Sequence, residues 1–206
     1  MKRLDNKVAI VTGASKGIGA GIAKAFGAEG AAVVVNFARD HEGAERVVRE
    51  ITGKGEQAIA VQGDVAQRSD AQRLVAEAKK AFGRLDVLVN NAGVFSFAPF
   101  EQFSEQEFHR QFNTNVLGTF LMIEAALPAF GAEGGSIINI GSTESVAGDP
   151  TLSIYVASKS AVDGLTRCSQ KSSAPGKSAL TLSVPVEPKL RVRKRRASWA
   201  RSLRSR

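Results

Sequence analysis

Short apolar runs alternate with helical patterns along most of the chain. The first run, residues 7–12, is short, rich in β-branched residues and followed by glycine, as is typical of a buried parallel strand. Further strands are predicted over residues 31–37, 57–64, 86–93 and 136–142. Apolar residues at helical spacing predict helices over residues 17–29, 41–53, 68–82, 104–130 and 153–168. Repeated strand–helix–strand units predict an α/β fold with a doubly wound parallel sheet, whose ligands bind at the carboxyl ends of the strands.

The length and charge of the chain suggest one folded domain and a basic tail. A chain of 206 residues with 43% hydrophobic and 23% charged residues is typical of one globular domain. The net charge is +8, but residues 169–206 contain eleven Lys or Arg and one acid, a balance of +10, which leaves −2 for residues 1–168. We therefore expect the domain over residues 1–168 and a poorly ordered basic tail over residues 169–206. The tail is interpreted as a solvated run without a specific nucleic-acid partner.

Composition also restricts the compartment and the metal chemistry. Cys168 is the only cysteine, so an internal disulfide is excluded and a multi-cysteine metal site is not expected. No apolar run approaches the roughly 18 residues of a membrane span, and the N-terminus lacks a signal-peptide pattern. The expectation is a cytoplasmic protein that does not associate with membranes.

A glycine-rich segment lies between the first predicted strand and the first helix. Gly13, Gly17 and Gly19 follow a G-x-x-x-G-x-G spacing. Glycine permits a tight turn and a close approach of phosphate, and the following helix N-terminus favours negative charge. Alone, the segment is equally consistent with an ordinary turn, but its place in the strand–helix pattern predicts a Rossmann-like dinucleotide site.

The residues after the second strand bear on the choice of cofactor. Folds that bind NAD usually place an acid there, about 20 residues past the glycines, to bind the ribose hydroxyls. Here Asn36 occupies that place, Arg39 is nearby, and Lys16 lies in the glycine segment. The two cations favour the 2′-phosphate of NADP. In the alternative, Arg39 is a solvated loop residue, Asp40 caps the next helix, and the cofactor is NAD.

A tyrosine and a lysine lie one helical turn apart in the last predicted helix. Tyr155 and Lys159 are separated by four residues, so their side chains point the same way. A phenol beside a fixed cation suits proton transfer at a carbonyl, and the ammonium is expected to lower the phenol pKa from about 10. Ser142 closes the fifth strand shortly before this pair. The alternative is an amphipathic helix with an incidental pair.

Six motifs occur together in one order: TGASKGIG at residues 12–19, Asp64 in GDV, NNAG at residues 90–93, Asn115, Ser142, and YVASK at residues 155–159. With these, the chain resembles the short-chain dehydrogenase/reductase family over residues 5 to about 168. Within the family it is most similar to bacterial 3-oxoacyl-[acyl-carrier-protein] reductases and glucose dehydrogenases. The resemblance implies NAD(P)(H)-dependent interconversion of a carbonyl and a secondary alcohol by hydride transfer, with a 3-oxoacyl thioester as one candidate substrate.

The resemblance also implies roles for individual residues. Tyr155 would be the general acid, Lys159 would hold the nicotinamide ribose, Ser142 would orient the substrate oxygen, and Asn115 would support a water relay. Contacts with NADP, or with NAD, would come from Gly13, Ser15, Lys16, Gly17, Ile18, Gly19, Asn36, Arg39, Asp64, Val65, Asn91, Ala92, Gly93, Tyr155 and Lys159. No metal is needed. The partners would be a small carbonyl or alcohol substrate and, by the tendency of the family, three further copies of the chain.

A cluster of phenylalanines follows the fourth predicted strand. Phe95, Phe97, Phe100 and Phe103 lie within nine residues of each other. Such a cluster more often belongs to a core or an interface, and part of it could instead wall the substrate pocket.

The family pattern is not recognisable past Cys168. Pro175 and Gly176 are expected to end the helix early, and a shifted reading frame from about Ser169 would explain the loss of the expected sixth strand. The fifth strand would then expose an apolar edge, with residues 181–186 as a makeshift edge strand. We expect marginal stability, aggregation, and weak or absent turnover. A cofactor-binding but inactive remnant is therefore the alternative function, and a basic-tailed binding module is a third.

Overall fold

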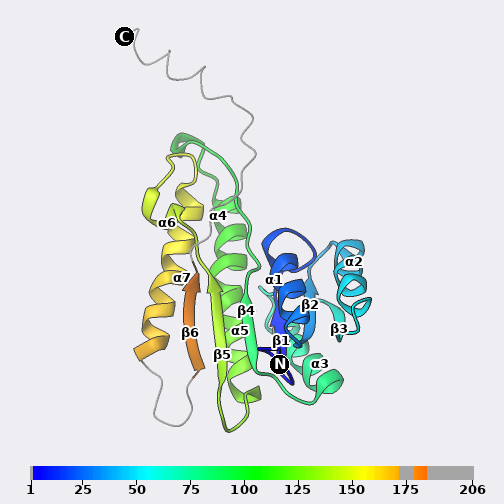
Figure 1. Ribbon diagram of the computed structural model, residues 1–206. Helices are drawn as coiled ribbons and strands as arrows, with labels where there is room; N and C mark the ends of the chain where they lie inside the picture. Colours follow the sequence, from blue (N-terminus) through cyan, green and yellow to red (C-terminus); the bar gives the residue numbers. More distant parts are fainter. Residues whose placement is uncertain (1, 172–178, 185–206) are drawn as a thin grey trace, which may run out of the picture.

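The computed structural model describes residues 2–171 and 179–184. At its centre is a six-stranded sheet in which every strand pairs in parallel with its neighbour, in the order β3-β2-β1-β4-β5-β6 (Figure 1). The strands are β1 (Val8–Val11), β2 (Ala32–Phe37), β3 (Ala58–Gln62), β4 (Val87–Asn90), β5 (Gly135–Ile140) and β6 (Ala179–Val184). The chain first builds the sheet outward from β1 to β3, and then returns to β4 on the other side of β1. This order confirms the predicted doubly wound, Rossmann-like fold and places its switch point between β1 and β4.

Helices cover both faces of this sheet. The longer ones are α1 (Gly17–Ala28), α2 (His41–Thr52), α3 (Arg68–Phe82), α4 (Glu105–Phe112), α5 (Gly118–Ala126) and α7 (Ser153–Lys171). Ile10 and Leu88 pack in one buried cluster with residues of α3 and α5, whereas Val11 and Val89 pack in a second cluster with residues of α1 and α2. Because β1 and β4 are covered on both sides, all of their residues are buried, which explains their continuous apolar runs.

The helix predicted over residues 104–130 is not uniform. A π-helical turn, η2 (Asn113–Leu117), separates α4 from α5, and a short 3₁₀ turn, η3 (Leu127–Ala129), ends the segment. Two further short helices are η1 (Phe100–Gln102) and α6 (Glu144–Ala147). Inside α-helices, π turns frequently mark functional positions, and this one contains Asn115.

The edge of β5 corrects one sequence-based expectation. The fifth strand does not expose its edge, because β6 pairs with it along its whole length, from Gly135 opposite Ala179 to Ile140 opposite Val184. The prediction of a makeshift strand is confirmed for residues 181–184, and residues 185–186 lie outside the described residues. Helix α7 begins at Ser153, as predicted, and continues to Lys171. The predicted stop at Pro175 and Gly176 and most of the basic tail also lie outside the described residues.

Candidate functional site

The glycine segment forms a tight loop between β1 and α1. Gly13 and Gly17 have φ values of 61° and 59°, a region that side chains other than glycine rarely adopt. At Gly19, a Cβ would overlap the side-chain amide of Asn91 and would lie 2.7 Å from the Gly13 carbonyl oxygen. The inner side of the loop is therefore closely packed. At Gly17 nothing lies within 4 Å of the position a Cβ would take, so the outer side is open to a ligand.

Thr12 and Asn91 join this loop to the loop after β4. The Thr12 hydroxyl donates to the Val89 carbonyl oxygen at 3.1 Å and accepts from the Asn91 and Ala92 amides at 2.9 and 3.0 Å. The Asn91 side chain donates to the carbonyl oxygens of Thr12 and Gly13, at 2.8 and 3.1 Å. The two loops are thus fixed to each other at the switch point between β1 and β4. The sequence reasoning did not single out Thr12.

The structure places Asn36 under the glycine loop. Its side chain is 1% exposed, accepts from the Gly13 amide at 3.1 Å, and donates to the carbonyl oxygens of Val61 and Gly63 at 3.3 and 3.0 Å. These bonds tie the loop to the ends of β2 and β3. In this structure the buried Asn36 side chain supports the loop, whereas the sequence reasoning placed it among the residues that contact the cofactor.

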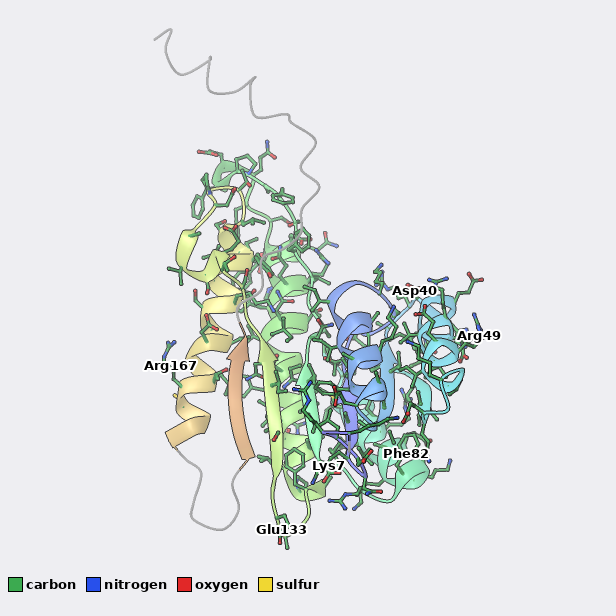
Figure 2. The ribbon with its side chains drawn as sticks, in the orientation of Figure 1. Lys7, Asp40, Arg49, Phe82, Glu133 and Arg167 are labelled. Atoms are coloured by element: carbon green, nitrogen blue, oxygen red, sulfur yellow. The ribbon has the colours of Figure 1, made fainter. Side chains whose placement is uncertain are left out.

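Exposed residues surround the loop. Lys16, Ile18 and Arg39 are exposed, and Ser15 is buried. Asp40 accepts from the Gly43 amide at 3.0 Å, so it caps α2, as the alternative interpretation of this segment predicted (Figure 2). Lys16 and Arg39 make no ion pair with any residue that the structure describes.

Two more predicted cofactor residues lie at the end of β3. Asp64 is exposed, and its carboxylate accepts from the Ala66 amide at 3.0 Å. Val65 is buried and packs so closely against Gly118 of α5 that a Cβ there would lie 3.2 Å from the Val65 Cβ. Of the two, only Asp64 presents a side chain to solvent.

The four predicted catalytic residues come from three parts of the chain and are all buried. Tyr155 and Lys159 lie on α7, Ser142 follows β5, and Asn115 lies in η2. Lys159 Nζ lies 5.9 Å from the centroid of the Tyr155 ring and donates to the Ile140 carbonyl oxygen at 2.7 Å. A Cβ at Gly93 would lie 3.6 Å from this ammonium, so the group faces the loop after β4.

Asn115 links this loop to α7. Its side-chain oxygen accepts from the Val94 amide at 2.8 Å, and its side-chain nitrogen donates to the Val94 carbonyl oxygen and to the Ser158 hydroxyl, both at 2.9 Å. Ser158 in turn donates to the Tyr155 carbonyl oxygen at 2.7 Å. The π turn therefore presents one amide that holds both the loop after β4 and the helix carrying Tyr155.

Burial dominates the electrostatics of the tyrosine–lysine pair. Burial raises the pKa of Tyr155 above its usual value, a hydrogen bond with Ser142 lowers it, and the charge of Glu144 raises it. The pKa of Tyr155 is therefore raised and not lowered as expected, because desolvation of the phenol is the largest effect on it. Burial also lowers the pKa of Lys159 to about 8, against the charge of Asp163, which raises it.

Aromatic side chains lie beside the tyrosine. The rings of Phe95 and Tyr155 meet edge to face with centroids 5.7 Å apart, and Phe97 contacts Phe95 in the same way at 5.7 Å. Phe95 and Phe97 are 43% and 48% exposed, so they are not core residues. The Arg110 guanidinium donates to the Phe95 carbonyl oxygen at 3.2 Å and holds this loop against α4. An exposed apolar surface therefore adjoins the buried phenol.

In residues 2–171 and 179–184, no three His, Cys, Asp or Glu side chains gather in a way that could hold a metal ion. In the same part of the chain, no helix combines the length and the apolar character needed to cross a bilayer. The chemistry that the arrangement supports is proton transfer by a buried phenol, near the loops that follow β1 and β4.

A family model described as short chain dehydrogenase matches residues 7–185. The chain belongs to the short-chain dehydrogenase family. The match continues past Cys168 and through β6, so the family resemblance extends beyond the boundary near residue 168 that the sequence motifs indicated. This short-chain dehydrogenase therefore keeps the family pattern across all six strands of its sheet.

Several relatives are similar over most of this chain. An uncharacterized oxidoreductase of Methylorubrum extorquens is 49% identical over 185 residues, which cover 90% of this chain and 74% of the relative. Versicolorin reductase 1 of Aspergillus parasiticus is 43% identical over 166 residues, which cover 81% of this chain and 63% of the relative. A short chain dehydrogenase of Burkholderia cenocepacia, solved in complex with NADP, superposes with a TM-score of 0.80 at 36% identity, covering 86% of this chain and 73% of that one. This short-chain dehydrogenase thus spans about two thirds to three quarters of the length of these relatives.

Proposed function

We propose that this chain is an NADP(H)-dependent oxidoreductase that interconverts a carbonyl and a secondary alcohol. The observation that carries the proposal is the position of the buried Tyr155–Lys159 pair, whose ammonium faces Gly93 beside the two loops that Thr12 and Asn91 join. A dinucleotide lying along the glycine loop toward Gly93 would bring its reactive end to this pair. Family membership and the NADP complex of the Burkholderia relative support the proposal.

The residues around the glycine loop fit a dinucleotide. The inner side of the glycine loop is closely packed and its outer side is open at Gly17, as a site for phosphate requires. Lys16 and Arg39 are exposed cations, and no acid occupies the Asn36 position, which favours the 2′-phosphate of NADP over the free hydroxyl of NAD. When bound, the cofactor supplies or accepts the hydride.

Side chains of this protein would donate the proton to the substrate oxygen and replace it afterwards. A tyrosine, with an ordinary pKa of about 10, is protonated at neutral pH, and burial raises the pKa of Tyr155 further, so its hydroxyl can donate to the oxygen of a ketone as that oxygen gains charge. Ser142, hydrogen-bonded to Tyr155, would hold the same oxygen. Lys159 would stabilise the phenolate that remains, and Asn115 would support a water relay that carries a proton from solvent to Lys159. Substrate would lie against Phe95 and Phe97, which favours a ketone with a large apolar group.

The experiment combines binding and turnover. NADPH fluorescence should change on titration with the purified chain, and NADPH oxidation should follow addition of an apolar cyclic ketone. Tyr155→Phe should leave the NADPH Kd within about threefold of wild type and lower kcat by at least about 10²-fold, since it removes only the acidic hydroxyl. A Tyr155→Phe variant with wild-type turnover would refute the proposed role. A 3-oxoacyl thioester is assayed in parallel as the other candidate substrate.

Binding without turnover is the second candidate function. The basic sequence over residues 186–206 favours it, because it lies past the end of the family match at residue 185. Wild-type chain that binds NADPH but oxidises it with neither ketone nor thioester would support this candidate. Failure to bind NADPH would contradict both.

A further inference from the structure

A third ionisable residue continues the row formed by the tyrosine and the lysine on α7. Tyr155, Lys159 and Asp163 follow one another at intervals of four residues, so they share one face of the helix. The Asp163 carboxylate accepts from the Ser145 hydroxyl at 2.8 Å. Ser145 lies in α6, the short helix that follows Ser142. Asp163 therefore connects the helix that carries Tyr155 to the segment that carries Ser142.

The hydrogen bonds of Ser145 show how this connection reaches Ser142. The Ser142 carbonyl oxygen lies 2.7 Å from the Ser145 hydroxyl and 3.2 Å from the Ser145 amide. A serine has one hydroxyl proton, and here it faces two acceptors. Because the amide also reaches the Ser142 carbonyl, the hydroxyl proton can go to Asp163 without leaving that carbonyl unpaired. The Glu144 amide donates to the Ser142 hydroxyl oxygen at 3.2 Å, so the same turn also orients the Ser142 side chain.

Asp163 also acts on Lys159 through its charge. Burial lowers the pKa of Lys159 to about 8, and the negative charge of Asp163 opposes that shift. Two other groups lie near the ammonium: the Ile140 carbonyl on β5, which accepts from it, and the titratable phenol of Tyr155, whose ring centroid is 5.9 Å away. Glu144, on α6, is the charge that acts on Tyr155. Asp163 is therefore the group that favours the charged form of Lys159.

We propose that Asp163 is a positioning residue with two separable effects: through Ser145 it fixes the turn that carries Ser142, and through its charge it keeps Lys159 protonated. Asp163 contacts neither substrate nor cofactor in this account. The consequence for turnover rests on the proposed function. The two effects themselves are properties of the folded chain and are measurable without turnover.

Two variants separate the effects. Asp163→Asn removes the charge but keeps an oxygen that can accept from Ser145. Ser145→Ala removes the tether but keeps the charge. The matched control is Glu133→Gln, which also removes one negative charge but lies next to the amino end of β5, at the opposite end of the sheet from the site (Figure 2). Each variant differs from wild type by only a few atoms, and unfolding curves identify any that fails to fold.

The charge is tested by NMR of protein labelled with [ε-¹³C]lysine, in which the Lys159 signal is identified by its loss in Lys159→Arg. We expect this signal to titrate near pH 8 in wild type and in Ser145→Ala, and roughly half a unit or more lower in Asp163→Asn. The tether is tested by hydrogen exchange of the Ser145 and Val146 amides. Exchange should accelerate roughly five- to tenfold in Ser145→Ala and stay near wild type in Asp163→Asn, since only the former removes the hydroxyl that lies between Asp163 and the Ser142 carbonyl oxygen.

A Lys159 titration that moves no further in Asp163→Asn than in Glu133→Gln overturns the charge effect. Unchanged exchange in Ser145→Ala overturns the tether. Where the chain turns over, the whole pH profile of kcat/KM should shift to lower pH in Asp163→Asn. Ser145→Ala should lower kcat without shifting that profile. Absence of turnover in wild type counts against the proposed function alone, because the NMR and exchange results still decide this proposal.

Discussion

Replacing the buried lysine should make the protein more stable at low pH. Lys159 is 5% exposed, and its pKa falls from 10.5 to about 8 on folding. The unfolded chain therefore binds more protons than the folded chain between these two values, so wild-type stability rises with pH across that window. At pH 6 the cost of the buried charge is about 3 kcal/mol, and at pH 9.5 it has fallen to about 1 kcal/mol. Lys159→Met removes this cost, and it loses one hydrogen bond to Ile140 at every pH.

Urea unfolding followed by circular dichroism at pH 6 and pH 9.5 measures the effect. The stability of Lys159→Met relative to wild type should be about 2 kcal/mol more favourable at pH 6 than at pH 9.5, or about 4–8 °C in Tm for a chain of this size. Lys80→Met is the control, because its side chain is 78% exposed and carries no burial cost. A difference between Lys159→Met and wild type that stays constant, or grows with pH, would refute the reasoning. The m-values must also agree between the proteins for the comparison to hold.

Two further predictions concern the glycine loop. Gly19→Ala should weaken NADPH binding at least about tenfold and lower Tm, because the added Cβ would overlap Asn91. The control is Gly21→Ala on the open side of α1, which should bind NADPH normally and be more stable than wild type by up to about 1 kcal/mol. Asn36→Asp restores the acid with which related folds bind NAD, but here it should destabilise the protein by roughly 2 kcal/mol and leave the cofactor preference unchanged. The reason is that a carboxylate would face the Gly63 carbonyl oxygen, to which the Asn36 amide now donates. Isothermal titration with NADPH and NADH, together with thermal unfolding, checks both. Normal NADPH binding by Gly19→Ala, or tighter NADH binding by a stable Asn36→Asp, would contradict them.

Much of the fold follows from local pattern. The strands and helices that the sequence predicts agree with the structure to within a few residues, because buried parallel strands and amphipathic helices leave strong periodic signals. Glycine spacing also located the tight loop between β1 and α1. Helix α3 has the predicted bounds, Arg68–Phe82. The π turn was missed, since a single extra residue in a helix leaves the apolar spacing almost unchanged.

The remaining features depend on contacts between distant residues. Asn36 stands where a cofactor acid is usually found, but its side chain turns inward to residues 25 and more positions away, which no local pattern encodes. The pKa of Tyr155 depends on how much protein surrounds the phenol, and spacing alone gave the wrong direction. The bond between Ser145 and Asp163 joins two elements, and neither residue type signals it alone. Strand β6 was underestimated because its neighbours in sequence are basic and turn-rich.

The most direct test uses the fact that Tyr155 is the only tyrosine in the chain, so ultraviolet absorbance of tyrosinate reports on this residue alone. We predict that burial keeps the pKa of Tyr155 above the usual value of tyrosine in the free chain, and that its titration moves to lower pH with saturating NADP⁺, whose positively charged ring would lie beside the phenol. Adenosine 2′,5′-bisphosphate, which lacks that ring, should bind without moving the titration to the same extent. An unchanged Tyr155 titration in protein shown to be saturated with NADP⁺ would contradict the central claim that this tyrosine faces the reactive end of the cofactor.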